Sequence, residues 1–307
     1  MSPWLGGIRA WSETWIDKLR SPRTVYEDLK ALPPTMLIGG FIVLVYVFVA
    51  LTSQWWTPYS HTAVGLSTPF DKASGAHWFG TDSVGRDVFT RTMFATRLEI
   101  VIAVLGTTFG FAVGIVIGLS AALVGGIYDE AMMRIAEAIH GIPTLIFAVM
   151  LVAIIGVTNS GNMWYVVLII GFVYSPGAAR LMRAAALELT TRDFIGMART
   201  RGESTLSITM RELLPNATGT LFVTYGVSVA AAPLIVGSLG FLGIGIRPPT
   251  AEWGQMITQN APAMLQSPAT VMGPALVLVG MVVGLNMFVD GLARVLGHST
   301  DLLARGT

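Results

Sequence analysis

Six long apolar runs, separated by polar segments, constrain the fold of this 307-residue chain more than any other feature. They cover residues 37–52, 100–127, 143–157, 164–181, 221–244 and 269–289. A helix needs about 20 apolar residues to cross a bilayer. The sequence therefore predicts an all-α polytopic membrane protein with six transmembrane helices. The third run is short and the second is long, so we expect the second helix to tilt or to protrude from the bilayer.

Composition agrees with a membrane protein. Hydrophobic residues make up 53% of the chain and charged residues only 12%, against about 25% charged residues in soluble domains. A net charge of +1 gives no basic surface, so nucleic acid is not an expected partner. The chain has no cysteine, which excludes disulfides, thiol catalysis and iron–sulfur clusters.

Lysine and arginine predict the orientation in the membrane. With the N-terminus inside, 14 of the 19 basic residues fall on the cytoplasmic side, which favours two cytoplasmic termini. Trp4, Trp11 and Trp15 recur at helical spacing, so residues 1–34 are predicted to be a cytoplasmic segment whose helix lies against membrane lipid.

Glycines recur at every fourth position of the second run, at Gly106, Gly110, Gly114 and Gly118. This spacing leaves one helix face without side chains, where a second helix can approach closely. We interpret the glycines as a helix-packing device.

Catalytic and metal-binding patterns are missing. The four histidines are scattered, and Glu137 and His140 form a single E-x-x-H where a di-metal site needs two. None of the three lysines stands in a phosphate-binding loop, so any ATP must bind to another chain. We predict no catalytic residue, no metal site and no cofactor in this chain.

Charged or strongly polar residues in the spans lie close to their ends, as at Glu99, Asn286 and Asp290. A carrier driven by protons or sodium usually shows an intramembrane carboxylate or broken helices around an ion site. Neither is conspicuous, which suggests that the driving force comes from outside the chain.

The segment 192–202 between the fourth and fifth runs has the pattern of a short helix that ends at a glycine. Phe194 and Ile195 stand among arginines in it. The apolar side chains of such a helix must be buried against another surface. Either it lies back on its own spans, or it inserts into a groove of a partner.

At this segment the sequence resembles the transmembrane subunits of ATP-binding cassette importers. Their signature is E-A-A, three residues, G, then a spacer and L-P, which Ala198, Gly202, Leu214 and Pro215 match in position. Four further segments, at 77–87, 129–143, 241–254 and 286–294, are similar to the second permease subunit of the dipeptide and oligopeptide branch, which nickel importers share.

The resemblance implies partners and a place in the cell. It implies a heterodimer with a second, homologous permease subunit in the cytoplasmic (inner) membrane of a prokaryote. Two ATPase subunits, or one fused ATPase, would hold ATP and Mg. An extracytoplasmic binding protein would deliver a peptide substrate, which would cross by alternating access.

The resemblance also implies site residues and a division of the chain. The coupling helix 192–202 would contact the ATPase, through Arg192, Asp193, Phe194, Ile195, Gly196, Ala198 and Gly202, with Leu214 and Pro215 following. The extracytoplasmic mouth, on the binding-protein side, would hold Gly80, Asp82, Arg86, Asp87, Phe241, Gly243, Gly245, Pro248, Pro249 and Trp253. The expected regions are 1–34, the first span with the start of a loop (35–75), a core with five spans (76–297) and a cytoplasmic tail (298–307).

Glycines and prolines after the fifth run predict a fold-back at this mouth even without the resemblance. Gly243, Gly245, Pro248 and Pro249 break the helix where it should leave the membrane. Irregular backbone at that depth must be buried in protein or line a water-filled cavity.

The chain departs from the resembled pattern in three places. Gly196 and Met197 replace Glu-Ala, so the expected carboxylate is missing or has moved to Asp193 or Glu203. Gly240 and Arg247 replace the usual Ser and Gln, and Ser175 stands where Trp is common.

Peptide import by a non-catalytic permease subunit is the function that the sequence favours. Import of a nickel chelate or another small ligand is the alternative inside the same branch. A self-sufficient secondary carrier and a membrane-bound enzyme are alternatives from other classes.

Overall fold

The fold is almost entirely helical over the residues that the computed structural model describes, 32–190, 192–214 and 218–305. The long helices are α3 (Pro34–Trp56), α4 (Val88–Val124), α8 (Met163–Thr190), α12 (Thr218–Phe241) and α14 (Ala269–Arg305). The short ones are α5 (Gly126–His140), α6 (Thr144–Ile155), α7 (Val157–Ser160), α9 (Asp193–Thr200), α10 (Thr205–Ile208), the π-helical η1 (Thr209–Leu213), α13 (Trp253–Asn260) and the 3-10 helix η2 (Ala261–Ala263). The predicted all-α fold is confirmed.

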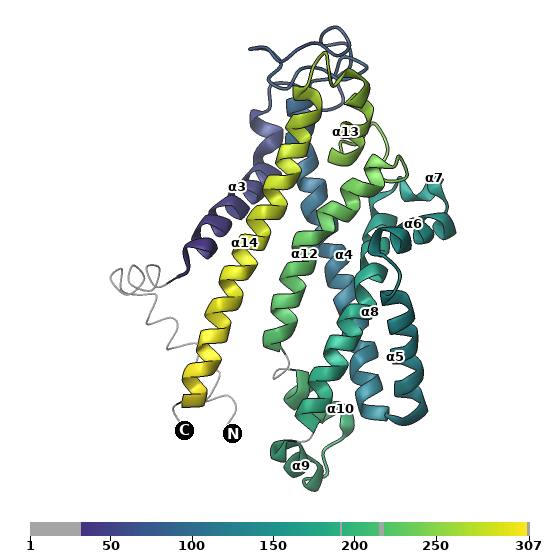
Figure 1. Ribbon diagram of the computed structural model, residues 1–307, viewed down its shortest axis with the longest axis vertical. Helices are drawn as coiled ribbons and strands as arrows, with labels where there is room; N and C mark the ends of the chain where they lie inside the picture. Colours follow the sequence, from purple (N-terminus) through teal and green to yellow (C-terminus); the bar gives the residue numbers. More distant parts are fainter. Residues whose placement is uncertain (1–31, 191, 215–217, 306–307) are drawn as a thin grey trace.

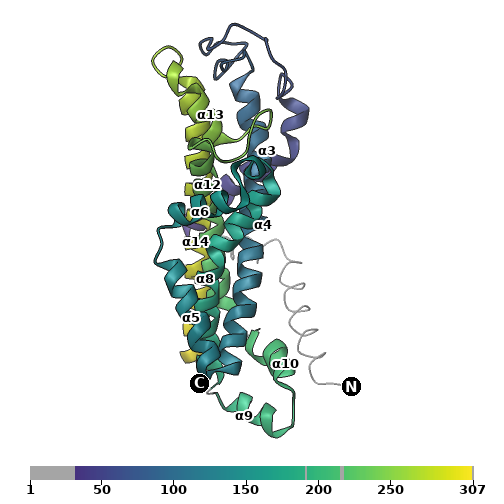
Figure 2. The same ribbon diagram turned by 90° about the vertical axis from the view of Figure 1, so that its right-hand side faces the viewer.

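The long helices lie side by side in an elongated bundle (Figures 1 and 2). The segments 57–87 and 242–268, which include α13, gather at one end of the bundle, and we call them the cap. Helices α9 and α10 lie at the opposite end. The two predicted functional regions of the chain are thus at opposite ends of the molecule.

Helix α4 packs along α8 on the face that carries its four glycines. A Cβ atom on Gly110 would lie 2.5 Å from the carbonyl oxygen of Gly171, and one on Gly114 would lie 2.5 Å from the Cβ of Ala178. Real Cβ atoms do not approach other atoms so closely. The backbones of α4 and α8 can therefore touch only because the glycines of α4 carry no side chain.

The third predicted span is not one straight helix. Helix α6 has 12 residues, too few for a bilayer, and it follows α5 with a bend of 101°. Within the described ranges, five helices are long and apolar enough to cross by themselves, and the bent α5–α6 pair makes the sixth candidate. The bend falls at Gly141 and Pro143, where proline fixes its own φ and restricts the residue before it.

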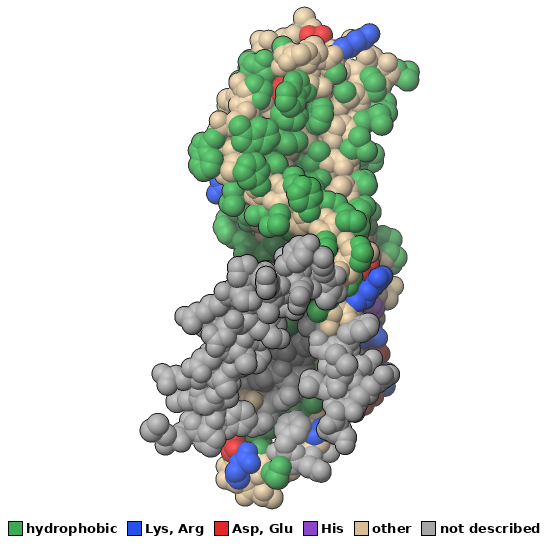
Figure 3. All heavy atoms as spheres, turned by 90° about the vertical axis from the view of Figure 1, so that its left-hand side faces the viewer, with side chains coloured by type: hydrophobic (Ala, Val, Ile, Leu, Met, Phe, Trp, Pro, Cys, Tyr) green, Lys and Arg blue, Asp and Glu red, His purple; other side chains and the backbone are tan. Residues whose placement is uncertain are grey.

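Apolar side chains cover the outside of the bundle at α3 (Figure 3). Phe41, Leu44, Leu51 and Trp55 are each more than 60% exposed there. A soluble surface does not carry such a dense apolar patch, whereas lipid tails accept it.

Helices α4 and α14 extend furthest beyond the predicted apolar runs. Helix α4 begins at Val88, before the apolar run, because the side chain of Asp87 caps its N-terminus. Helix α14 continues to Arg305, so most of the predicted tail 298–307 belongs to it. The predicted interfacial helix at 1–34 falls almost wholly in residues 1–31, outside the described part of the chain.

Candidate functional site

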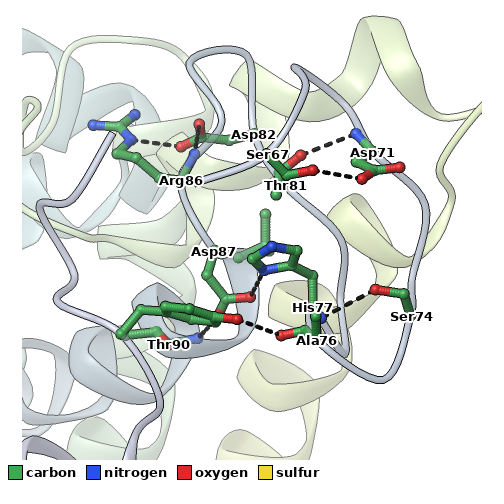
Figure 4. A network of polar contacts seen from close by, with 12 residues as sticks. Ser67, Asp71, Ser74, Ala76, His77, Thr81, Asp82, Arg86, Asp87 and Thr90 are labelled. Atoms are coloured by element: carbon green, nitrogen blue, oxygen red, sulfur yellow. Dashed lines mark hydrogen bonds and ion pairs between the residues drawn. The ribbon is translucent and has the colours of Figure 1, made fainter. Parts of the chain in front are cut away.

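Asp87 organises the part of the cap between α3 and α4 (Figure 4). Its Oδ2 accepts a hydrogen bond of 2.7 Å from the backbone N–H of Thr90, which starts α4. Its Oδ1 lies 2.9 Å from Nδ1 of His77, and both side chains are buried. The predicted residue Asp87 therefore holds the cap onto the helix.

Asp82 stabilises the neighbouring turn in the same way. Its Oδ2 accepts from Nε of Arg86 at 2.6 Å, and its Oδ1 accepts from the backbone N–H groups of Val84 and Arg86 at 3.0 Å. Gly80 has a φ of 74° and lies against the carbonyl of Asp71, where a side chain would collide. These predicted mouth residues are all buried, so they shape the cap and leave the outer surface to residues such as Trp78 and Val84.

Arg91 joins the two segments of the cap. Its Nη1 donates to the carbonyl oxygens of His61 at 2.9 Å and Pro249 at 3.1 Å, and the side chain is 1% exposed. Sequence analysis missed this residue. The available signal was an arginine one turn after the capping Asp87, directly before an apolar run.

The chain folds back after α12. Gly243 has a φ of 76°, and Gly245 lies so close to the helix end that a Cβ would be 2.8 Å from the nitrogen of Gly240. Trp253 then enters the bundle, where it is fully buried and its Nε1 donates to the carbonyl of Thr92 at 2.9 Å. Pro248 and Pro249, joined by a cis peptide bond, lie between these points, and Phe241 is exposed at the end of α12.

A pair of buried carboxyl groups lies where the cap meets α4: Glu99 of α4 and Glu252 of the cap, and both are 0% exposed. Glu252 caps α13 by accepting from the backbone N–H groups of Gly254 at 2.6 Å and Gln255 at 2.7 Å. Burial raises the pKa of Glu252 to about 7. Two adjacent buried carboxylates repel each other, so the pair is stable when it shares a proton.

The same pair explains the departure at Gly240. The carboxyl group of Glu252 occupies the space that a side chain at Gly240 would need. Sequence analysis noted Glu99 only as a charge near a helix end. Its partner is far away in the chain, so no local pattern indicated the pair.

At the opposite end, α9 packs on its own chain with one face. Ile195 and Ala198 are buried in a cluster with Ile208 and Leu213, and Leu123 at the end of α4 packs against this cluster. Of the two predicted alternatives, Ile195 lies back on its own chain. Its side chain supports α9 from behind and is not exposed for the predicted ATPase contact.

The other face of α9 is open. Gly196 and Met197 are exposed, and a Cβ on Gly196 would meet no atom within 4 Å. Gly202 follows with a φ of 74°, the conformation that ends a helix at glycine. A partner can therefore reach Gly196 and Met197, the two positions that depart from the resembled signature.

The remaining coupling residues pair within the chain, are half-buried or lie outside the described part. Arg192 pairs with Glu188 at 3.2 Å, and Glu203 accepts from Nε of Arg201 at 2.9 Å. This bond lowers the pKa of Glu203. Glu203 and Asp193 are the two candidates to replace the glutamate that is missing at Gly196, and Glu203 is thus already paired with Arg201. Leu214 is half-buried. Pro215 and the side chains of Asp193 and Phe194 lie outside the described residues.

A cavity of about 700 Å³ opens between α4, α5, α8 and α12. Charged and hydroxyl side chains line it together with apolar ones, among them Glu137, Arg180, Thr224 and Ser228. No group of three or more His, Cys, Asp or Glu residues in the described part of the chain could hold a metal ion. The cavity therefore presents both charged and apolar groups.

Comparisons with known proteins place these features in a wider group. Residues 114–301 match the family described as binding-protein-dependent transport system inner membrane component. The chain is 33% identical to the dipeptide transport system permease protein DppC of Bacillus subtilis over 75% of this chain and 71% of the relative. It is also 33% identical to the nickel transport system permease protein NikC of Escherichia coli, over 82% and 89%.

A solved structure has a similar fold. A chain of the MetNI methionine ABC transporter, in inward facing conformations, superposes with a TM-score of 0.50 at 21% identity, over 65% of this chain and 93% of that chain. At this identity the similarity concerns the fold alone.

Proposed function

Because the chain belongs to the family of binding-protein-dependent transport system inner membrane components, and is thus a permease subunit of an ABC importer, we propose that it carries short peptides across the cytoplasmic membrane of a prokaryote. The observation that supports this cargo is the similarity, at 33% identity over most of the chain, to a dipeptide transport permease. The permease is a multi-pass membrane protein that belongs to a non-catalytic family.

Its proposed partners follow from the two ends of the molecule. A second, homologous permease subunit completes the pathway, and two ATPase subunits or one fused ATPase bind the open face of α9 at Gly196 and Met197. ATP and Mg are held by those ATPases, since this sequence has no phosphate-binding loop. A binding protein docks at the cap, and both termini lie in the cytoplasm.

Transport in this proposal is an alternating-access change. Closure of the ATPases moves α9, and the bundle switches between states that open toward the cap and toward α9. Substrate binding energy and ATP shift the populations of these two states.

Purification of the chain from its native membrane in a gentle detergent tests the proposal. We expect a second permease and P-loop ATPases to co-purify, and the complex in proteoliposomes to import a labelled dipeptide only with ATP and the binding protein. ATP-dependent uptake of a nickel chelate without peptide uptake would identify the chelate, and not a peptide, as the cargo. Uptake by the chain alone without ATP would overturn the importer mechanism.

A further inference from the structure

Two contacts define how α5 and α8 are aligned beside the cavity. Arg183 of α8 donates to Asp129 of α5 through Nε at 2.9 Å and Nη2 at 2.5 Å. Toward the other end, the ring of His140 lies 3.9 Å from the position that a Cβ on Gly177 would take. The two helices therefore run antiparallel, with Asp129 beside Arg183 and His140 beside Gly177.

This register places two opposite charges across from each other. Three residues back from His140 on α5 is Glu137, and three residues on from Gly177 on α8 is Arg180. Residues three apart share a helix face, so both face the side where the helices meet. Both line the cavity.

Neither charge is paired directly within the described residues, although Glu137 also acts electrostatically on Arg183. Arg183 and Asp129 satisfy each other, whereas Glu137 and Arg180 form no ion pair or side-chain hydrogen bond with any residue that the structure describes. Both side chains are exposed. Ionisable residues in membrane-spanning helices are costly, and where they face a water-filled cavity they mark ligand pathways.

We propose that this cavity is a binding station on the transport route, in which Arg180 holds the carboxylate and Glu137 holds the ammonium group of a zwitterionic ligand such as a short peptide. The inference rests on the proposed function and specifies what the pathway recognises.

The chemistry of the lining suits this ligand. A guanidinium binds a carboxylate through two parallel hydrogen bonds, and a carboxylate accepts charge-assisted bonds from an ammonium group. The hydroxyl groups of Thr144, Thr224 and Ser228 line the same cavity, where they can meet peptide groups. Its volume of about 700 Å³ falls within the roughly 300–1,000 Å³ of pockets that enclose small ligands.

Peptides with capped ends test the proposal in the reconstituted complex with its binding protein. The probes are trialanine, N-acetyl-trialanine and trialanine amide, each at a concentration that saturates uptake. Glu137→Gln should lower trialanine uptake about tenfold and that of N-acetyl-trialanine less than about twofold, because the acetylated peptide has no ammonium group. Arg180→Gln should show the same contrast between trialanine and its amide.

Glu130→Gln and Arg134→Gln are the matched controls. These residues pair with each other on the exposed face of α5, and neither lines the cavity. Uptake of all three peptides should stay at the wild-type rate in both. Equal losses for free and capped peptides in the cavity variants would overturn the proposal and assign the two residues to a structural contact or a gate. No loss at all would also overturn it.

Photo-crosslinking gives a second measurement that does not depend on delivery by the binding protein. A diazirine-bearing trialanine should label α5 or α8 of the purified complex, and the double variant Glu137→Gln/Arg180→Gln should lose that label. Labelling confined to other helices, with peptide uptake intact, would defeat this inference and leave the proposed function standing. Absence of uptake for every peptide would instead defeat the proposed function.

Discussion

Arg91 of α4 donates a hydrogen bond from Nη1 to the carbonyl oxygen of Pro249, a residue that follows α12 in the sequence. The same nitrogen binds the carbonyl of His61. The two segments of the cap thus meet at this buried guanidinium. A second link runs from Oγ of Ser267 to the carbonyl oxygen of Asp71 at 3.0 Å.

Substitution of this arginine should loosen the cap. Arg91→Met removes the donor of two partly buried carbonyl oxygens, which we expect to cost about 2 kcal/mol of unfolding free energy. The apparent unfolding temperature of the purified complex should fall, and trypsin should cleave the cap faster. Arg97→Met, at an exposed position of the same helix, is the control. Equal behaviour of the two variants would contradict the role of Arg91.

The glycine face of α4 should not accept a side chain. In Gly110→Leu the new Cβ would lie 2.5 Å from the carbonyl of Gly171, so α4 and α8 must separate along their length. We expect the yield of monodisperse complex to fall several-fold by size-exclusion chromatography. Val116→Leu, on an exposed face of the same helix, should assemble normally. A normal yield from Gly110→Leu would refute close backbone packing at this point.

The buried carboxyl pair predicts a pH dependence of stability. Because burial raises the pKa of Glu252 to about 7, the folded protein keeps a proton that the unfolded chain releases near pH 4.5. Folding is then favoured fully at low pH, and this contribution is lost as the pH rises through 7. A shift of this size corresponds to on the order of 3 kcal/mol. The apparent unfolding temperature should therefore fall between pH 5 and pH 8.

Glu252→Gln separates this effect from other titrations. An amide in place of this carboxyl group does not titrate, so the slope between pH 5 and pH 8 should become shallower. Glu130→Gln, an exposed acid on α5, should keep the wild-type slope. An identical slope in Glu252→Gln and the wild type would show that Glu252 does not hold this proton.

The two faces of α9 should respond differently to a charge. Met197→Asp places a carboxylate on the open face, where it should reduce transport per ATP hydrolysed while the complex still assembles. Ile195→Asp buries the same charge in the cluster with Ala198, which should cost several kcal/mol and lower the yield. Transport and ATPase rates in proteoliposomes distinguish the two outcomes. Normal coupling in Met197→Asp would rule out this face as the ATPase contact.

Sequence patterns predicted the parts of the fold that depend on local chemistry. Apolar runs located the long helices, and the four-residue spacing from Gly106 to Gly118 predicted the close approach that α8 makes. Turn chemistry at Gly243 and Gly245 predicted the fold-back after α12. The physical causes of these features act within a few residues. Apolar runs favour helices away from water, and glycines permit close backbone approach or a positive φ.

Features that depend on contacts distant in sequence could not be predicted. The pairing of Glu99 with Glu252 and the bonds of Arg91 join residues from different helices and loops. Burial of Asp82 and Arg86 turned expected surface residues into the internal framework of the cap. Ile195 shows the same limit, since an apolar residue among arginines fits a partner groove as well as its own bundle.

Helix α4 runs without interruption from the cap, where Asp87 starts it, to Leu123, which packs beneath α9. Its 37 residues form a rod about 56 Å long. Because α8 locks onto its glycine face, the rod is stiffened along its length and has no joint that could absorb a small movement. For a straight helix of this length, a tilt of about one degree at the α9 end would displace the other end by about 1 Å.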